Sequence, residues 1–226
     1  MTAYPQLAAL AGGLVVSCQA LDGEPLHGPV HMSAMAQAAL KAGAVGIRAN
    51  GAEDIRAIRA LTDRPIIGIK KFPLPDGRLF ITPDAASARE VVEAGASIVA
   101  LDCTHLRHPD DGEMAGLIEF IQDELGIPAM ADCATLADAK RADRLGAAIV
   151  ATTLVPGDSP DFALLGEILA AVGATVIAEG HFWQPEELVR ALHMGTHAVV
   201  IGAAITDPYL ITARFLRTVK SWSPVR

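Results

Sequence analysis

The sequence has no cluster of positive charge, no paired cysteines and no long apolar run. Its 226 residues include 18 lysines and arginines against 26 acidic residues, which gives a net charge of −8. Surfaces that bind nucleic acid need concentrated positive charge, so a nucleic-acid partner is not expected. The three cysteines, Cys18, Cys103 and Cys133, are widely spaced and lack a Cys-x-x-C pair, so neither a disulfide framework nor a zinc site is predicted.

The composition is apolar, although no segment is long enough to span a membrane. Hydrophobic residues make up 51% of the chain, and the mean hydropathy is +0.35. Because no apolar run approaches the length that crosses a bilayer, the excess fits strands buried on both faces, and no membrane partner is expected. Residues 1–11 lack a basic region ahead of an apolar core, which predicts no secretory signal and a cytoplasmic location.

The Gly-x-Gly-x-x-Gly signature of dinucleotide-binding sheets is also missing after the first predicted strand. Short apolar segments instead alternate with helix-like segments along the chain. The predicted strands are Leu14–Ser17, Val45–Arg48, Pro65–Lys71, Ile98–Asp102, Pro128–Asp132, Ala148–Ala151, Thr175–Glu179 and Ala198–Ile201. This order predicts an α/β fold, a single (β/α)8 TIM barrel over residues 1–226, with an open doubly wound sheet as the less favoured alternative. Residues 72–82 interrupt the order and are predicted to form a loop or small hairpin over the barrel mouth.

Polar residues stand where the predicted strands end. They are Gln19, Arg48, Lys71, Asp102, Asp132, Thr152, Thr153 and Glu179. In a barrel of this kind the active site lies at the carboxyl ends of the strands. Charged groups directly after apolar strands are costly to bury, and a barrel mouth gives them water, each other or a substrate. The cluster is therefore the predicted active site.

The last two predicted strands each stop at a glycine, Gly180 and Gly202. In barrels, the backbone N–H groups that follow these two strands often hold a phosphate. A lysine and a glutamate above such a site suit proton transfer at a carbon next to a carbonyl. Lys71 is expected to have a lowered pKa because Arg48 lies nearby and the side chain is partly buried. Schiff-base chemistry at this lysine is the alternative.

Two adjacent lysines, Lys70 and Lys71, close the third predicted strand. Neighbouring residues of a strand point to opposite sides, so only one of the two can face the pocket easily. The other is expected to be an ordinary solvated lysine.

Six motifs occur together in a fixed order. They are Ser17-Cys-Gln-Ala20, Gly46-Ile-Arg-Ala-Asn-Gly51, Pro65-Ile-Ile-Gly68 with Lys71, Thr152-Thr-Leu154, Ile177-Ala-Glu-Gly180 and the segment from Gly202 to Thr206. As a set they resemble the N-acetylmannosamine-6-phosphate 2-epimerases, and the likeness runs from about Leu14 to Phe215.

The resemblance implies a (β/α)8 barrel that interconverts N-acetylmannosamine 6-phosphate and N-acetylglucosamine 6-phosphate in amino-sugar and sialic acid breakdown. It implies no redox cofactor and no metal, a small sugar phosphate as the partner, and it leaves a homodimer open. By the same resemblance, Lys71 exchanges the C2 proton and Glu179 assists. The other implied positions are Gln19, Arg48, Asp132 and Thr153 for the sugar, and Gly180, Gly202 and Ala203 for the phosphate.

The chain departs from the family pattern around the rim of the site. The departures are Phe72 with Pro73 after the third strand, Val155 after Thr152-Thr-Leu154, His181 after Gly180, Ala203 in place of serine and Asp207 where arginine is common. The groups expected to carry out the chemistry are kept, whereas the surroundings of the phosphate lose two cations and gain an acid.

Two other functions fit the same residues. One is a metal-dependent sugar-phosphate epimerase or isomerase that uses Asp102, His105 and Asp132 as ligands, because these residue types suit a divalent ion. The other is a barrel that binds a sugar phosphate with little catalysis, a hypothesis suggested by the altered rim.

Overall fold

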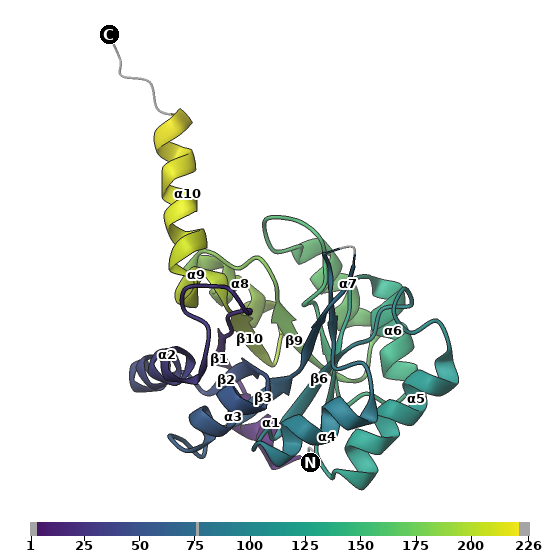
Figure 1. Ribbon diagram of the computed structural model, residues 1–226. Helices are drawn as coiled ribbons and strands as arrows, with labels where there is room; N and C mark the ends of the chain where they lie inside the picture. Colours follow the sequence, from purple (N-terminus) through teal and green to yellow (C-terminus); the bar gives the residue numbers. More distant parts are fainter. Residues whose placement is uncertain (1–3, 76, 222–226) are drawn as a thin grey trace.

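The computed structural model describes residues 4–75 and 77–221, and a closed barrel of eight parallel strands forms its centre (Figure 1). The strands are β1 (Gly13–Cys18), β2 (Gly46–Asn50), β3 (Ile66–Ile69), β6 (Ile98–Asp102), β7 (Ala129–Asp132), β8 (Ile149–Ala151), β9 (Thr175–Glu179) and β10 (Ala198–Ile201). Closure occurs at β1, where Val16 pairs with Ile47 of β2 on one side and with Ile201 of β10 on the other. The predicted (β/α)8 barrel is confirmed, and the open-sheet alternative is wrong.

Helices cover the outside of the barrel and connect successive strands (Figure 1). They are α2 (Pro29–Ala42), α3 (Ala52–Arg59), α4 (Ala85–Glu93), α5 (Asp111–Glu119) with its π-helical continuation η1 (Phe120–Glu124), α6 (Leu136–Arg144), α7 (Phe162–Ala171) and α8 (Pro185–Met194). Their ends follow local chemistry. The Asp84 side chain caps α4 by accepting the Ser87 N–H, and Gly43 ends α2 in a left-handed conformation that glycine adopts without strain.

The apolar residues form two layers separated by the sheet. One layer fills the barrel interior and is continuous with Leu7 and Leu10 of α1 (Pro5–Leu10), a short helix ahead of β1 that the sequence pattern did not predict. The other layer lies between the strands and the surrounding helices. At Gly68 the packing leaves no room for a side chain, since a Cβ there would lie 2.5 Å from the Cβ of Ala96. The three cysteines are buried and free.

The third strand ends earlier than predicted. The strand expected over Pro65–Lys71 stops at Ile69, and Lys71 begins a separate antiparallel pair, β4 (Lys71–Pro73) with β5 (Leu79–Ile81). The backbone of Lys70 turns toward this hairpin, exchanging hydrogen bonds with Thr82 rather than with a barrel strand. Lys71 is therefore carried by the hairpin, beyond the last residue of β3.

The chain after β10 forms α9 (Ala203–Thr206) and the long helix α10 (Pro208–Ser221), which extends away from the barrel (Figure 1). Arg214 of α10 contacts the loop after β9, with its guanidinium 4.8 Å from the centre of a Trp183 ring. Within the described part of the chain, no helix is both long enough and apolar enough to span a membrane.

Candidate active site

The side chains at the mouth continue the inward rows of the strands. Along each strand every second residue points into the barrel, and the apolar inward positions belong to the interior layer. Two residues further along each row, the side chain is polar or absent. The rows run Val15 to Ser17, Ile69 to Lys71, Ala100 to Asp102, Met130 to Asp132, Ala151 to Thr153, Ile177 to Glu179 and Val200 to Gly202. The period of two thus brings most of the predicted site residues to one place.

A cavity of about 580 Å³ occupies this end of the barrel. Its lining includes the predicted residues Gln19, Arg48, Lys71, Asp102, Thr153 and Glu179. A smaller adjoining cavity of about 210 Å³ shares Gln19 and Lys71 with it and is closed by Gly202, Ala203 and Asp207. Lys71 therefore stands between a large chamber and a small one.

Arg48 of β2 joins two carboxylates from the far side of the barrel, on the strands β7 and β9 that flank β8. Its two terminal nitrogens donate to both oxygens of Asp132 at 3.1 and 2.5 Å, and one of them also donates to Glu179 Oε2 at 2.7 Å. The Thr153 hydroxyl donates to Asp132 at 2.6 Å. Arg48 and Asp132 are almost completely buried, so this ion pair is shielded from water and fixes where Glu179 lies.

Two polar atoms of this group have no hydrogen-bond partner among the described residues. They are Nε of Arg48 and Oε1 of Gln19, both buried. The amide nitrogen of Gln19 is held by the Ser17 hydroxyl at 2.7 Å. A buried donor or acceptor without a partner costs free energy, and a polar ligand that completes these bonds would remove the cost.

Lys71 and Glu179 have pKa values displaced toward each other. Burial lowers the pKa of Lys71 to about 8, and the nearby Arg48 charge acts in the same direction. Burial raises the pKa of Glu179, and Asp132 adds to this, while Arg48 opposes it. The expected lowering at Lys71 is confirmed in direction and cause. Lys70 instead forms an ion pair with Glu90 of α4 on the outside of the barrel.

The three residues predicted to hold a phosphate fall into two places. Gly202 and Ala203 line the small cavity, where α9 begins and its first N–H groups lack partners within the helix. Gly180 lines a separate narrow space beside Thr152 and His181. A Cβ at Gly180 would lie 3.3 Å from the Thr152 carbonyl oxygen, so this position is confined by backbone.

Asp207 also lines the small cavity, and it has a structural task there. Its Oδ1 accepts the Leu210 N–H at 2.8 Å and so caps the start of α10. Glu24 is the second carboxylate on the same wall. The charge near Gly202 and Ala203 is thus provided by two acids and by Lys71.

The structure does not assemble the donor set of the metal-dependent alternative. Asp132 is occupied by Arg48 and Thr153, and Asp102 accepts both the N–H and the hydroxyl of Thr104. The His105 side chain is exposed and does not line the cavity. Over residues 4–75 and 77–221, no group of three or more histidine, cysteine or acidic side chains has a geometry that could hold a metal ion.

Three residues that line the large cavity or contact Lys71 were not singled out from the sequence. Asn50 accepts the Lys71 N–H at 2.9 Å, while Arg78 of the hairpin and Arg107 of the loop after β6 both line the large cavity. Asn50 is two inward positions beyond Gly46 and follows Arg48 in its row, so the period of two could have found it. The two arginines lie on irregular segments, where no such period applies.

Comparison with known sequences and structures agrees with the geometry. Residues 32–221 match the profile of a family described as "Putative N-acetylmannosamine-6-phosphate epimerase". The chain belongs to this family. Among relatives carrying the name "Putative N-acetylmannosamine-6-phosphate 2-epimerase", one from Listeria monocytogenes serotype 4b (strain CLIP80459) is 42% identical over 93% of this chain and 96% of its own length. Another, from Caldanaerobacter subterraneus subsp. tengcongensis, is 42% identical over 93% and 92%.

A solved structure of the epimerase family has the same fold. The N-acetylmannosamine-6-phosphate 2-epimerase from Clostridium perfringens matches with a TM-score of 0.87 at 39% identity, over 94% of this chain and 95% of that one. The resemblance inferred from the six motifs is therefore confirmed for the whole barrel.

Proposed function

We propose that this chain interconverts N-acetylmannosamine 6-phosphate and N-acetylglucosamine 6-phosphate by proton transfer at C2. The observation that carries the proposal is the presence of Lys71 and Glu179 in one cavity at the carboxyl ends of the strands, with pKa values displaced toward neutrality. Groups with such values are suited to give and take protons near pH 7. Family membership supports the choice of substrate.

The chemistry assigns a step to each group. In the open-chain sugar, C2 is next to the C1 aldehyde, so the neutral amine of Lys71 takes the C2 proton while the C–H electrons move toward the C1 oxygen. The enediol-like intermediate is planar at C2. Return of a proton to the opposite face gives the epimer, and Glu179 is the group proposed to assist by supplying or accepting it. Arg48 keeps the Glu179 carboxyl in place during both steps.

Binding of the substrate is assigned to the remaining predicted residues. Gln19, Arg48, Asp132 and Thr153 are proposed to hold the sugar, and the unpartnered atoms of Gln19 and Arg48 support this. Backbone groups at Gly202 and Ala203 are proposed to hold the phosphate in the small cavity, because small side chains let a ligand approach the main chain closely. The third position, Gly180, borders a separate narrow space, and its part in holding the phosphate stays a prediction. Such a phosphate would have Asp207 as a neighbour in the small cavity.

Incubation with N-acetylmannosamine 6-phosphate in heavy water tests the function directly. We expect formation of N-acetylglucosamine 6-phosphate together with incorporation of deuterium at C2, followed by NMR. Binding of the sugar phosphate without exchange would instead support the binding-barrel hypothesis, and activity that is lost with a chelator would support the metal-dependent one.

The pH dependence of kcat/KM should report the lowered pKa of Lys71. The reaction needs the neutral Lys71 amine together with a protonated Glu179 carboxyl, so kcat/KM is expected to pass through a maximum near neutral pH, with its alkaline limb at the Lys71 pKa of about 8. An unperturbed lysine would place this limb near 10.4. Initial rates measured between pH 6 and pH 10.5 distinguish a limb near 8 from a limb near 10.4. A limb near 10.4 would contradict the assignment of Lys71 as the base.

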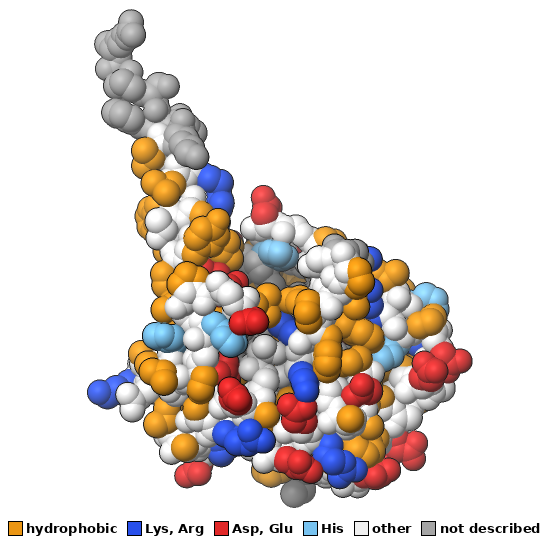
Figure 2. Space-filling model, viewed as in Figure 1, with side chains coloured by type: hydrophobic (Ala, Val, Ile, Leu, Met, Phe, Trp, Pro, Cys, Tyr) orange, Lys and Arg blue, Asp and Glu red, His pale blue; other side chains and the backbone are white. Residues whose placement is uncertain are grey.

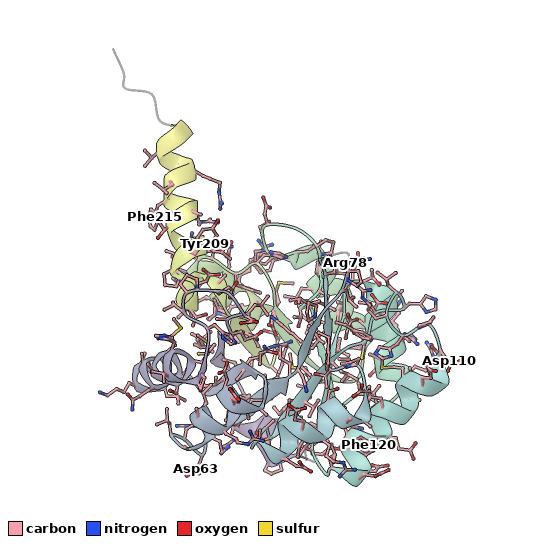
Figure 3. All side chains as sticks on the ribbon, viewed as in Figure 1. Asp63, Arg78, Asp110, Phe120, Tyr209 and Phe215 are labelled. Carbon is pink, nitrogen blue, oxygen red and sulfur yellow. The ribbon has the colours of Figure 1, made fainter. Side chains whose placement is uncertain are left out.

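We further infer that the protein assembles as a homodimer through α10. This helix extends from the barrel and carries a row of exposed apolar side chains (Figure 2). Tyr209, Phe215, Leu216 and Val219 are 75%, 70%, 52% and 63% exposed, and their spacings of three, four and seven residues put them on one face. Figure 3 shows Tyr209 near the start of α10 and Phe215 further along it, on the part that extends beyond the barrel. An apolar face of this kind is typical of a surface that is covered by a partner, and a symmetric pair is the commonest assembly.

Light scattering with size-exclusion chromatography tests the assembly. The protein is expected to elute with the mass of two chains, and Phe215→Ser combined with Val219→Ser is expected to give a monomer. Val30→Ser is the matched control, because Val30 is 76% exposed but lies on α2. A dimer that survives the double substitution would show that α10 is not the interface.

A cytoplasmic location and a role in amino-sugar and sialic acid breakdown complete the proposal. A sugar phosphate carries charge that does not cross a bilayer unaided, so an enzyme acting on it is proposed to work where the phosphate is formed.

A further inference from the structure

One strained residue lies directly beside the proposed base. Among the described residues other than glycine, Thr82 and His181 have positive φ angles, 47° and 62°. Thr82 is the more unusual because its branched Cβ crowds the backbone in this region. It is also completely buried. Strain of this kind persists only where surrounding contacts fix it, and it is frequent where the position of a functional group matters.

Thr82 is hydrogen-bonded to Lys70, and the residue before it pairs with Lys71. The Thr82 N–H donates to the Lys70 carbonyl oxygen at 2.8 Å, and the Thr82 hydroxyl accepts the Lys70 N–H at 3.1 Å. One residue earlier, Ile81 pairs with Lys71 across the hairpin. Thr82 therefore uses both its backbone and its side chain to close the base of the hairpin on Lys70.

These hydrogen bonds hold the backbone of Lys70 where pairing with the barrel strands has ended. Because β3 ends at Ile69, Lys70 and Lys71 lie beyond the last strand pairing with β2, which is between Asn50 and Ile69. On the barrel side, the Asn50 side chain accepts the Lys71 N–H at 2.9 Å. With Thr82 on one side and Asn50 on the other, the segment is fixed with Lys70 outward and Lys71 inward.

The hydroxyl is the part of Thr82 that backbone pairing cannot replace. Without it the Lys70 N–H would lose its acceptor in a partly buried setting, and the segment would gain by shifting to find another. A small displacement of a reacting group lowers the rate strongly, because proton transfer needs close approach and alignment. A shift would also carry the Lys71 amine away from the buried position next to Arg48.

We propose that Thr82 is a positioning residue for the proposed proton transfer: its strained, buried backbone and its hydroxyl lock the base of the β4–β5 hairpin so that Lys71, and not Lys70, enters the cavity. The assignment rests on the proposed function through Lys71. Thr82 acts through the lysine backbone and is not assigned a contact with the substrate.

Thr82→Val tests the proposal, since valine keeps the branched shape and removes the hydroxyl. We expect kcat for C2 exchange to fall roughly 10- to 100-fold with little change in KM. Thr82→Ser restores the hydroxyl and is expected to keep most of the turnover. If the valine variant does not fold, Thr82→Ala removes the same hydroxyl with less crowding at positive φ and is expected to show the same loss.

Ser97→Ala provides a matched control at the opposite end of the same strand. The Ser97 hydroxyl accepts the Ile66 N–H at 3.0 Å, where β3 begins, just as Thr82 accepts the Lys70 N–H after β3 ends. If hydroxyl loss acts only through stability, both variants should melt earlier and both should keep wild-type turnover. We expect that only the Thr82 variant loses turnover.

A second readout does not depend on turnover. The pH dependence of Lys71 acetylation, followed by mass spectrometry, gives the Lys71 pKa, which is about 8 in the wild type. In Thr82→Val it is expected to move upward, because the amine leaves its buried place beside Arg48. Wild-type turnover and an unchanged Lys71 profile in a folded Thr82→Val protein would overturn the proposal. A wild-type protein that lacks C2 exchange would overturn the proposed function instead, and the acetylation profiles would still decide the role of Thr82.

Discussion

Replacing Lys71 with alanine is expected to abolish exchange of the C2 proton. The amine lines both cavities, and a methyl group in its place can neither accept nor return a proton. The loss in turnover should reach or exceed the roughly 10²–10⁴-fold scale of general acid–base catalysis. Deuterium incorporation at C2, measured by NMR at matched concentrations of folded protein, is the appropriate observable.

Lys70→Ala is the control that the chain itself supplies. Lys70 has the same side chain, is the adjacent residue, and is directed outward to Glu90. Its removal should lower the melting temperature slightly and leave most of the exchange intact. The reverse pattern, with Lys70 essential and Lys71 dispensable, would show that the hairpin presents the other lysine to the substrate.

Glu179→Gln is expected to lower turnover by roughly 10²–10⁴-fold with little change in melting or in binding of the sugar phosphate. Glutamine keeps the shape of the side chain and an oxygen that can accept from Arg48, which now donates to Oε2 at 2.7 Å. It cannot carry a proton. Turnover, calorimetric melting and binding measured on the same preparation separate a chemical role from a structural one.

Glu187→Gln is the matched comparison for that substitution. Glu187 accepts the N–H groups of Trp183 and Gln184 at 2.7 and 2.9 Å at the start of α8, where its role is structural. This variant loses a negative charge in the first turn of α8, so it should melt slightly earlier, and it should turn over normally. A well-folded Glu179→Gln protein with full activity would leave Lys71 as the one proton-transfer group, and the two-residue mechanism would be wrong.

Side chains alternate between the inside and the outside of the barrel along each strand, and this alternation allowed much of the site to be predicted from the sequence. An apolar inward row that ends in a charged residue specifies both the strand and the direction of its last side chain, as in Ile177 followed by Glu179. Four of the seven inward rows end in such a charge, at Lys71, Asp102, Asp132 and Glu179, and all seven converge because a closed barrel brings the carboxyl ends of its strands together. The neighbourhood of Arg48, Asp132 and Glu179 follows from this geometry.

The features that sequence reasoning missed lie where that period stops. The end of β3 depended on hydrogen bonds between Lys70 and Thr82, residues twelve positions apart that no strand pattern relates. The place of Gly180 depended on how the loop after β9 packs against Thr152, so it was predicted next to Gly202 and is found in a separate space. The protruding direction of α10 has no local signature, because the helix pattern is the same whether or not it packs on its own barrel.

The burial of Lys71 and Glu179 in one cavity has a consequence for the direction of the reaction. In an epimerisation that uses one group on each face of the substrate, the enzyme finishes each turnover with its proton on the other group. The two forms, a neutral amine with a protonated carboxyl and an ammonium with a carboxylate, are tautomers of equal net charge. In water the gap of about six pKa units between lysine and glutamate would trap the second form. Here burial, with the Arg48 charge, lowers the pKa of Lys71, while burial and Asp132 raise that of Glu179 against the opposing effect of Arg48, so the free-energy gap between the tautomers narrows. An enzyme that has run in one direction is then left ready to run in the other.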